Sequence, residues 1–148
     1  MNGIIFMGLQ ASGKSTFFKH RFSDSHVRIN LDMLNTRTKE RALFNACVSA
    51  KIPCVIDNTN PRRADRSRYL ETFVKHKFSV YGFYFSSSIS ECLKRNSSRT
   101  QRNRIPDIAI RSTRNSFELP NSSEGFDKLF YVSLEDDEFI VEEWKDEI

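Results

Sequence analysis

The fold is decided by residues 8–16, GLQASGKST, which lie close to the start of the 148-residue chain. A short apolar run, GIIFM at residues 3–7, comes directly before them and predicts a buried strand. The residues after Gly13, KSTFFKHRF, predict a helix that begins at the glycine turn. The spacing G-x-x-x-x-G-K-[ST] between a strand and a helix is typical of a loop whose backbone N–H groups surround phosphate oxygens. The stretch therefore predicts a phosphate-binding loop.

This loop predicts a site for a nucleoside triphosphate, ATP or GTP, with Mg²⁺. The positive end of the helix dipole behind the loop favours the phosphates. We expect Lys14 to reach the β- and γ-phosphates and the hydroxyl of Ser15 to ligate Mg²⁺. The residues expected to contact the nucleotide are Gly8, Leu9, Gln10, Ala11, Ser12, Gly13, Lys14, Ser15 and Thr16.

The rest of the chain alternates between strand-like and helix-like patterns. The expected strands are 27–32, 53–59, 78–85 and 128–134, and the expected helices are 37–51, 61–77, 88–97 and 106–117. This alternation predicts an α/β fold in three layers, with helices on both faces of a central parallel sheet of about five strands. We expect a single domain over residues 1–148, in which the acidic C-terminal tail, 134–148, adds an edge strand or a short helix.

Composition is typical of a soluble globular protein, with 39% hydrophobic and 28% charged residues. No apolar run reaches membrane-spanning length, and the N-terminus has no signal-like leader. Cys47, Cys54 and Cys92 form no C-x-x-C pair and have no metal-ligand spacing with the histidines, which favours reduced thiols over a zinc site. We therefore expect a cytoplasmic protein without a membrane partner.

The net charge of +4 hides a strong asymmetry along the chain. The tail carries eight acidic residues and one lysine, which leaves 22 basic and 11 acidic residues on the preceding 133. A surplus of this size favours an anionic partner, either a nucleotide or a nucleic acid. The alternative is a solvated basic surface.

Two carboxylates end predicted strands. Asp32 closes RINLD and Asp57 closes CVID. Open parallel sheets bind ligands beyond the carboxyl ends of their strands. One carboxylate there can accept the proton of an attacking hydroxyl while another holds the water shell of a metal ion. Each could instead cap a helix, but their joint placement behind a phosphate-binding loop favours a functional role.

The basic stretch LKRNSSRTQRNR, residues 93–104, contains five basic residues and no acid. Arg95 and Arg99 are four residues apart and share a face if the helix continues. We expect a lid over about residues 95–106 that closes over the transferring phosphoryl group and neutralises its charge. A solvated helix end is the alternative.

Several stretches together resemble the polynucleotide 5′-hydroxyl kinases of the phage and animal repair type. They occur in the family's order and cover most of the chain: GLQASGKST, INLD, VIDNTNP, LKRNSSR, IPDIAIRSTRNSFELP and EGFDKLF. The combination of DNTNP with the basic stretch and P-x-x-x-x-x-S is more specific than the loop alone. The resemblance implies an adenylate-kinase-like P-loop core that transfers the γ-phosphate of ATP to a 5′-hydroxyl of DNA or RNA.

The resemblance also implies roles for single residues. Asp32 matches the general base, Arg99 matches the lid arginine on the transferring phosphate, and Arg95 is its supporting neighbour. The strip near the acceptor and the metal is matched by Asp57, Asn58 and Thr59. The phage enzyme continues into a phosphatase domain with a D-x-D-G-T motif, which this sequence lacks, so we expect kinase activity only.

The chain departs from the family around the expected base. The family usually has an arginine directly before the base, and the phage type has another shortly after it; Leu31 and Asn35 stand at these places here. The residues expected to replace this grip on the acceptor are Arg37 or the run Arg62, Arg63 and Arg66.

Two other interpretations stay open. One is a P-loop kinase of a small metabolite or a nucleotide-like substrate, and the other is a non-catalytic nucleotide-binding module. The sequence does not distinguish DNA from RNA as acceptor, or ATP from GTP as donor, and it predicts no oligomeric state.

Overall fold

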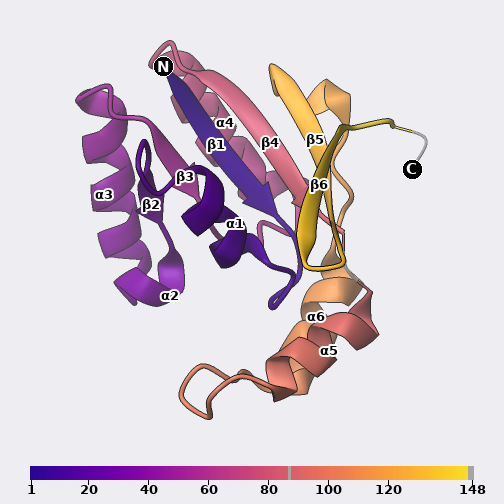
Figure 1. Ribbon diagram of the computed structural model, residues 1–148. Helices are drawn as coiled ribbons and strands as arrows, with labels where there is room; N and C mark the ends of the chain where they lie inside the picture. Colours follow the sequence, from indigo (N-terminus) through magenta and orange to yellow (C-terminus); the bar gives the residue numbers. More distant parts are fainter. Residues whose placement is uncertain (87, 147–148) are drawn as a thin grey trace.

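The computed structural model describes residues 1–86 and 88–146, and in this range a six-stranded sheet forms the centre of the protein (Figure 1). The strands are β1 (Asn2–Met7), β2 (Val27–Ile29), β3 (Cys54–Ile56), β4 (Ser79–Phe85), β5 (Lys128–Glu135) and β6 (Glu138–Glu143). Their order across the sheet is β2-β3-β1-β4-β5-β6. The first five strands are parallel, and β6 pairs antiparallel with β5. This confirms the predicted parallel sheet and adds a sixth strand at its edge.

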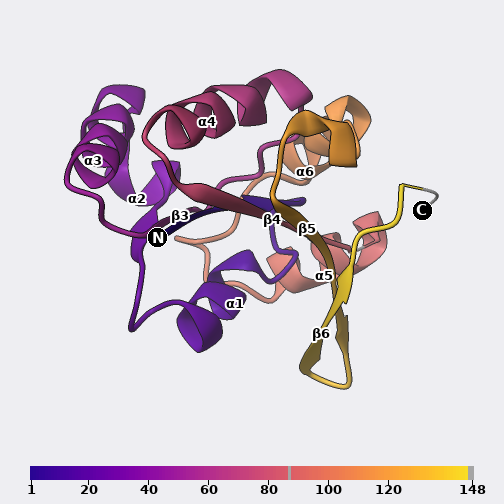
Figure 2. The same ribbon diagram turned by 90° about the horizontal axis from the view of Figure 1, so that it is seen from above.

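Helices cover both faces of the sheet. They are α1 (Lys14–Arg21), α2 (Leu31–Leu34), α3 (Arg37–Ser49), α4 (Arg63–Lys75), α5 (Ile89–Ser97) and α6 (Asp107–Ser116), with a short 3₁₀ helix, η1 (Ser122–Glu124). Figure 2 shows α3 and α4 on one face and α1 on the other. Figure 1 shows α5, α6 and the loop between them beyond the carboxyl ends of β1 and β4, where the lid was expected.

The core has one apolar cluster on each face of β1. Ile5 and Met7 belong to the cluster under α3 and α4, whereas Ile4 and Phe6 belong to the cluster under α1. This division follows from the alternation of side chains along a strand. On the α1 face the rings of Phe6 and its neighbours meet edge to face, at centroid distances of 4.9 to 6.0 Å. The strand that leads into the phosphate-binding loop is therefore fixed by packing on both sides.

The expected strand 27–32 is wrong in its second half. β2 ends at Ile29, and Leu31–Leu34 form the short helix α2. The side chain of Asn30 accepts a hydrogen bond from the backbone N–H of Met33, which is a strong helix-starting contact. Asp32 thus lies in the first turn of α2 and not at the end of a strand.

The tail forms the edge strand, the first of the two expected alternatives. Asp136 and Asp137 have φ angles of 49° and 62° and make the two-residue turn between β5 and β6, a conformation that aspartate tolerates well. Residues 147–148 of the tail lie outside the described part of the chain. Among the described residues no helix has the length and the apolar character that crossing a membrane requires.

Candidate active site

The loop between β1 and α1 has the curled backbone that its sequence predicts. Gly13 has φ of 100° and Ala11 has φ of 62°, both in the left-handed region. A Cβ at Gly13 would also lie 3.1 Å from the ring of Phe139, so glycine is required there for both conformation and space. A Cβ at Gly8 would lie 3.0 Å from both the Cβ of Phe85 and the Oγ of Ser12. Space therefore favours glycine at both positions, and at Gly13 the left-handed backbone conformation favours it as well.

Lys14 is almost fully buried at the start of α1. Its Nζ donates to the backbone oxygens of Gly8 and Leu9, at 2.9 and 2.6 Å, and to the Oγ of Ser12 at 3.3 Å. Burial lowers the pKa of Lys14 to about 8, since the protonated amine is poorly solvated there. The ammonium group of Lys14 lies inside the curled loop, where phosphate oxygens would bind.

Charges from three other predicted site residues reach the same lysine. The carboxylates of Asp57 and Asp32 raise the pKa of Lys14, and the guanidinium of Arg99 lowers it further. These residues come from four separate segments of the chain. The fold therefore brings Lys14, Asp32, Asp57 and Arg99 into one electrostatic environment.

Nucleotide binding at this loop should take up a proton above pH 8. Anionic phosphates favour protonated Lys14 and should return its pKa from about 8 toward the ordinary 10.5. At pH 9 the free protein holds Lys14 mostly neutral and the complex mostly charged, so binding takes up a large fraction of one proton. Calorimetry of ADP binding at pH 9 in buffers of different ionisation enthalpy measures this uptake. At pH 6.5 no uptake is expected from Lys14, and equal values at the two pH values would contradict its lowered pKa.

Ser15 and Asp57 lie next to each other and offer the oxygen donors that Mg²⁺ prefers. The Oγ of Ser15 donates to Oδ2 of Asp57 at 3.4 Å, and the side chain of Asp57 is only 1% exposed. A hydroxyl and a carboxylate beside a phosphate-binding loop suit Mg²⁺, which binds through a few protein oxygens and phosphate oxygens. Arg28 contacts both groups: its Nε donates to the same Oδ2 at 2.7 Å, and its Nη2 donates to Ser15 Oγ at 2.9 Å. The sequence analysis did not single out Arg28.

Asp32 is exposed on α2, and polar contacts fix the start of that helix. The backbone N–H of Leu31 donates to Oδ1 of Asn58 at 2.9 Å, and Nδ2 of Asn58 donates to Oε2 of Glu40 at 2.8 Å. Glu40 also accepts from the hydroxyl of Tyr69 at 2.7 Å. Burial and the hydrogen bond to Glu40 raise the pKa of Tyr69 to about 12. Glu40, which is buried in α3 and which the sequence analysis missed, thereby holds the segment that positions Asp32.

Helices α5 and α6, which flank the expected lid, contact the phosphate-binding loop directly. Nη1 of Arg95, in α5, donates to the backbone oxygen of Ala11 at 3.2 Å. Nε2 of Gln10 donates to Oγ1 of Thr113, in α6, at 2.9 Å. The side chain of Leu9 packs with residues of both helices in a small apolar cluster. The phosphate-binding loop is thus joined to α5 and α6 in the nucleotide-free protein.

Arg99 lies just beyond the end of α5 and is exposed. Asn96 closes the connection between α5 and α6, because its side chain donates to the backbone oxygen of Ile105 at 2.6 Å and accepts from the N–H of Ile105 at 3.0 Å. Asn96 itself is fully buried. The basic stretch therefore forms a closed loop whose base is fastened, with Arg99 near that base.

The residues that were expected to bind the acceptor substrate differ in their surroundings. Thr59 accepts a backbone hydrogen bond from Gly8 at 3.0 Å, and exposed Arg37 donates to Glu40 at 3.1 Å. Arg62 is exposed at the start of α4, and exposed Arg63 reaches the backbone oxygen of Ser123 at 3.5 Å.

Arg66 does not fit the role expected of it. Its side chain is fully buried and makes a bidentate ion pair with Glu124, so it is a structural residue and not a grip for an acceptor.

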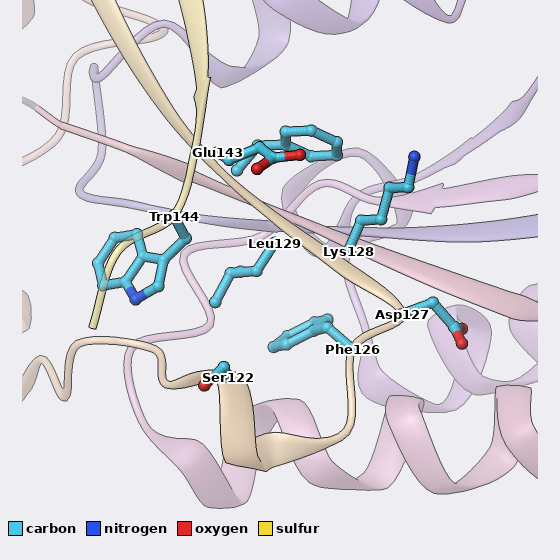
Figure 3. Close-up of a pocket in the computed structure, with 8 residues that line it drawn as sticks. Ser122, Phe126, Asp127, Lys128, Leu129, Glu143 and Trp144 are labelled. Carbon is cyan, nitrogen blue, oxygen red and sulfur yellow. The ribbon is translucent and has the colours of Figure 1, made fainter.

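A hollow of about 240 Å³ lies away from these residues, between β5, the end of β6 and η1 (Figure 3). Leu129, Phe126 and Trp144 face it, and Ser122 lies at its border. The carboxylate of Asp127 accepts a hydrogen bond from the backbone N–H of Val80 at 2.7 Å. None of the predicted site residues lines this hollow, so it is separate from the candidate active site.

Two curated relatives are similar to most of this chain. The bifunctional polynucleotide phosphatase/kinase of Schizosaccharomyces pombe is 27% identical over 134 residues, which cover 83% of this chain and 31% of that protein. The putative bifunctional polynucleotide phosphatase/kinase of Acanthamoeba polyphaga mimivirus is 28% identical over 164 residues, which cover 96% of this chain and 36% of that protein. The chain thus spans about a third of the length of these relatives.

Solved structures show the same fold. A gluconokinase from Sinorhizobium meliloti matches with a TM-score of 0.65 and 17% identity, over 89% of this chain and 82% of that one. Kti12 of Chaetomium thermophilum, solved in complex with ADP-AlF3, matches with a TM-score of 0.70 and 16% identity, over 92% and 91% of the two chains. At these identities the likeness concerns the fold, and it confirms the predicted P-loop NTPase class.

The family comparison covers the part of the chain described above as the site. The model of the AAA domain matches residues 4–120, from β1 and the phosphate-binding loop to the segment after α6. The chain therefore belongs to the AAA domain family and is a P-loop kinase-like domain.

Proposed function

We propose that this domain is an ATP-dependent phosphotransferase that moves the γ-phosphate of Mg·ATP to a 5′-hydroxyl of DNA or RNA. The observation that carries the proposal is geometric: the ammonium group of buried Lys14 lies inside the phosphate-binding loop, the buried carboxylate of Asp57 lies 3.4 Å from Ser15 beside it, and the charge of Asp32 acts on the same lysine. Phosphoryl transfer needs this combination: cations at the phosphates and a carboxylate at the acceptor. The names of the two relatives and the quoted sequence stretches support a polynucleotide as the acceptor.

The mechanism assigns each step to residues of the chain. The amides of residues 8–15 and Lys14 bind the phosphates. Asp32 accepts the proton of the acceptor hydroxyl as its oxygen forms a bond to the γ-phosphorus, while the bond from the γ-phosphorus to the β-phosphate oxygen breaks and ADP leaves. Arg99, supported by Arg95, stabilises the negative charge that spreads over the transferring group. Mg²⁺, held by Ser15 and Asp57, would neutralise charge on the phosphate oxygens. Positioning carries the rate, and no covalent intermediate with the protein is formed.

The acceptor would lie between α2 and the segment 57–63. Arg37, Arg62 and Arg63 are exposed cations that could contact an acceptor there. Asn58 connects the segment 57–63 to α2, and Thr59 connects it to the phosphate-binding loop. With Arg66 buried, fewer arginines remain to hold acceptor phosphates than the sequence suggested. This observation supports a second candidate, a kinase of a small metabolite or a nucleotide-like substrate, which needs no grip on acceptor phosphates.

A panel of acceptors tests the proposal. Labelled ATP with Mg²⁺ is incubated with 5′-hydroxyl oligonucleotides of DNA and RNA, with nucleosides and with small alcohols. We expect label on the oligonucleotides and not on their 5′-phosphorylated counterparts. Label on nucleosides or alcohols alone would establish the second candidate, and label on none of them would contradict the phosphotransferase.

Ionic strength separates the two candidates further. Each acceptor phosphate bound by the protein releases counterions, so the rate at low oligonucleotide concentration should fall steeply between 50 and 200 mM salt. For an acceptor with about three phosphate contacts, the salt dependence predicts a loss of roughly tenfold or more. The matched control is ADP affinity over the same salt range, which corrects for the nucleotide site. Equal salt dependence of rate and ADP affinity would contradict a polynucleotide acceptor.

A further inference from the structure

A guanidinium contacts both of the protein groups that suit Mg²⁺. Nε of Arg28 is 2.7 Å from Oδ2 of Asp57, and its Nη2 is 2.9 Å from Oγ of Ser15. The carboxylate and the hydroxyl are 3.4 Å apart, so all three groups form one closed set of contacts. Arg28 comes from β2, at the edge of the sheet, whereas Ser15 lies in the first turn of α1 and Asp57 follows β3.

Strand register explains why Arg28 reaches this place. Arg28 is paired with Val55 across the parallel strands β2 and β3, so both side chains point to the same face. Val55 belongs to the apolar cluster under α1. Asp57 is two residues further along and points to that face too. The side chain of Arg28 therefore extends along the α1 face toward the carboxyl end of β3, where its charge meets Asp57.

The contact is more than a surface ion pair. The side chain of Asp57 is 1% exposed, and that of Arg28 is 28% exposed. A buried carboxylate is costly without a cationic partner, and arginine stays protonated at every accessible pH. In the nucleotide-free protein Arg28 supplies the positive charge that Asp57 requires. Mg²⁺ would take its protein oxygen ligands from the same two groups, so the guanidinium and the metal ion compete for Oδ2 of Asp57 and Oγ of Ser15.

We propose that Arg28 is an internal competitor of Mg²⁺: it holds Ser15 and Asp57 in the free protein and yields both oxygens when Mg²⁺ arrives with the nucleotide. This inference rests on the nucleotide-binding part of the proposed function and on no acceptor. Its consequence is a weak Mg²⁺ site whose occupation is coupled to the phosphates. Arg28 then links metal binding to a side-chain movement at the edge strand.

The test measures Mg²⁺ dependence of ADP binding, without transfer. ADP affinity is determined by calorimetry at Mg²⁺ concentrations from EDTA upward, for the wild type and for Arg28→Gln, which keeps a hydrogen-bond donor but removes the charge. We expect the Mg²⁺ concentration at half-effect to fall by about tenfold, within the usual range of coupling between sites. ADP affinity in EDTA should fall, because Asp57 is then an unpaired negative charge beside the phosphates.

Two further variants control the result. Lys19→Ala removes one positive charge from the exposed face of α1 and should leave the Mg²⁺ half-effect unchanged. Arg28→Lys keeps the charge but loses the forked contact, and it should give an intermediate value. An unchanged or increased Mg²⁺ requirement in Arg28→Gln would overturn the proposal.

A measurement on the wild type covers the case in which Arg28→Gln does not fold. The Nε–H signal of Arg28 in NMR spectra, assigned with Arg28→Lys, should shift when Mg²⁺ is added to the ADP complex and not when ADP is added in EDTA. An Nε–H signal that is identical in the two complexes would refute the displacement. A protein without transfer activity whose Arg28 Nε–H signal still shifts with Mg²⁺ would contradict the proposed function but not this inference. A protein that does not bind ADP would contradict both.

Discussion

Asp32→Asn is expected to lower the rate of phosphoryl transfer by about 10²–10⁴-fold, the usual contribution of a general base. Asparagine has nearly the same shape as aspartate and is tolerated in the first turn of α2, but its amide does not accept the proton of the acceptor hydroxyl. ADP affinity should change little, because Asp32 acts on Lys14 only as a distant charge, the weakest of those that shift its pKa. Single-turnover kinetics with saturating ATP and acceptor measure the chemical step directly.

The matched control for Asp32→Asn is Asp24→Asn. Asp24 is exposed after the end of α1, so its substitution makes the same change in net charge away from the site. Its rate should equal that of the wild type. If Asp32→Asn turns over at the wild-type rate, Asp32 has no part in the mechanism, and another group must accept the proton.

Glu40 explains how Asp32 is held for this step. The chain of contacts runs from Glu40 through Asn58 to the backbone N–H of Leu31, the residue before Asp32. Asn30 adds a second tie, because its side chain donates to the backbone oxygen of Asp57 at 2.6 Å. A base fixed by the neighbouring strand segment needs little reorganisation when the acceptor binds. The geometry of Asp32 is thus tied to the DNTNP stretch.

The parts of the site that sequence predicted well are those coded by neighbouring residues. The phosphate-binding loop depends on glycine, lysine and serine at fixed spacing between an apolar strand and a helix, so its sequence pattern is local. The alternation of strands and helices likewise predicted the parallel sheet. Asp57 was found because it ends an apolar run, and parallel strands end at one edge.

The parts that sequence missed depend on which strands are neighbours. Arg28 meets Asp57 only because β2 pairs with β3, and the order β2-β3-β1 does not follow the chain. In the sequence, Glu40 resembles any other charged residue of a polar helix. Its role is visible only in the fold, where it accepts hydrogen bonds from Asn58 and Tyr69. The first two residues of α2, 31–32, were expected to continue the strand because Asn30, which starts the helix, follows directly on strand-like residues.

Arg66 is the converse case, a residue that the sequence suggested for the site and that the fold buries. In sequence it belongs to a basic run, which suggests an exposed grip for phosphates. In the fold its guanidinium is buried and has four acceptors: both carboxylate oxygens of Glu124 at 2.9 and 3.1 Å, and the backbone oxygens of Asn60 and Glu118, each at 3.0 Å. A charge pattern alone does not distinguish a binding cation from a buried one.

Glu124→Ala is therefore expected to destabilise the domain by about 3–5 kcal/mol, the usual cost of leaving one member of a buried ion pair without its partner. The Glu124 side chain is 2% exposed and that of Arg66 is 0% exposed, so water does not replace the lost carboxylate. Urea unfolding measures the loss. Glu71→Ala, on the exposed side of α4, removes the same kind of side chain and should stay within about 0.5 kcal/mol of the wild type.

The loss of stability should extend toward the candidate active site, because Arg66 joins the segment that contains Asn60 to the segment that contains Glu118 and Glu124. Asn60 presents its backbone oxygen to Arg66, and its side chain donates to the backbone oxygen of Phe6, in the strand before the phosphate-binding loop, at 2.7 Å. Loss of Glu124 should therefore increase hydrogen exchange at the N–H groups of residues 57–62 and in η1. A loss of stability below about 1 kcal/mol, the level of an exposed ion pair, would show that Arg66 finds water or another acceptor and is not held by Glu124.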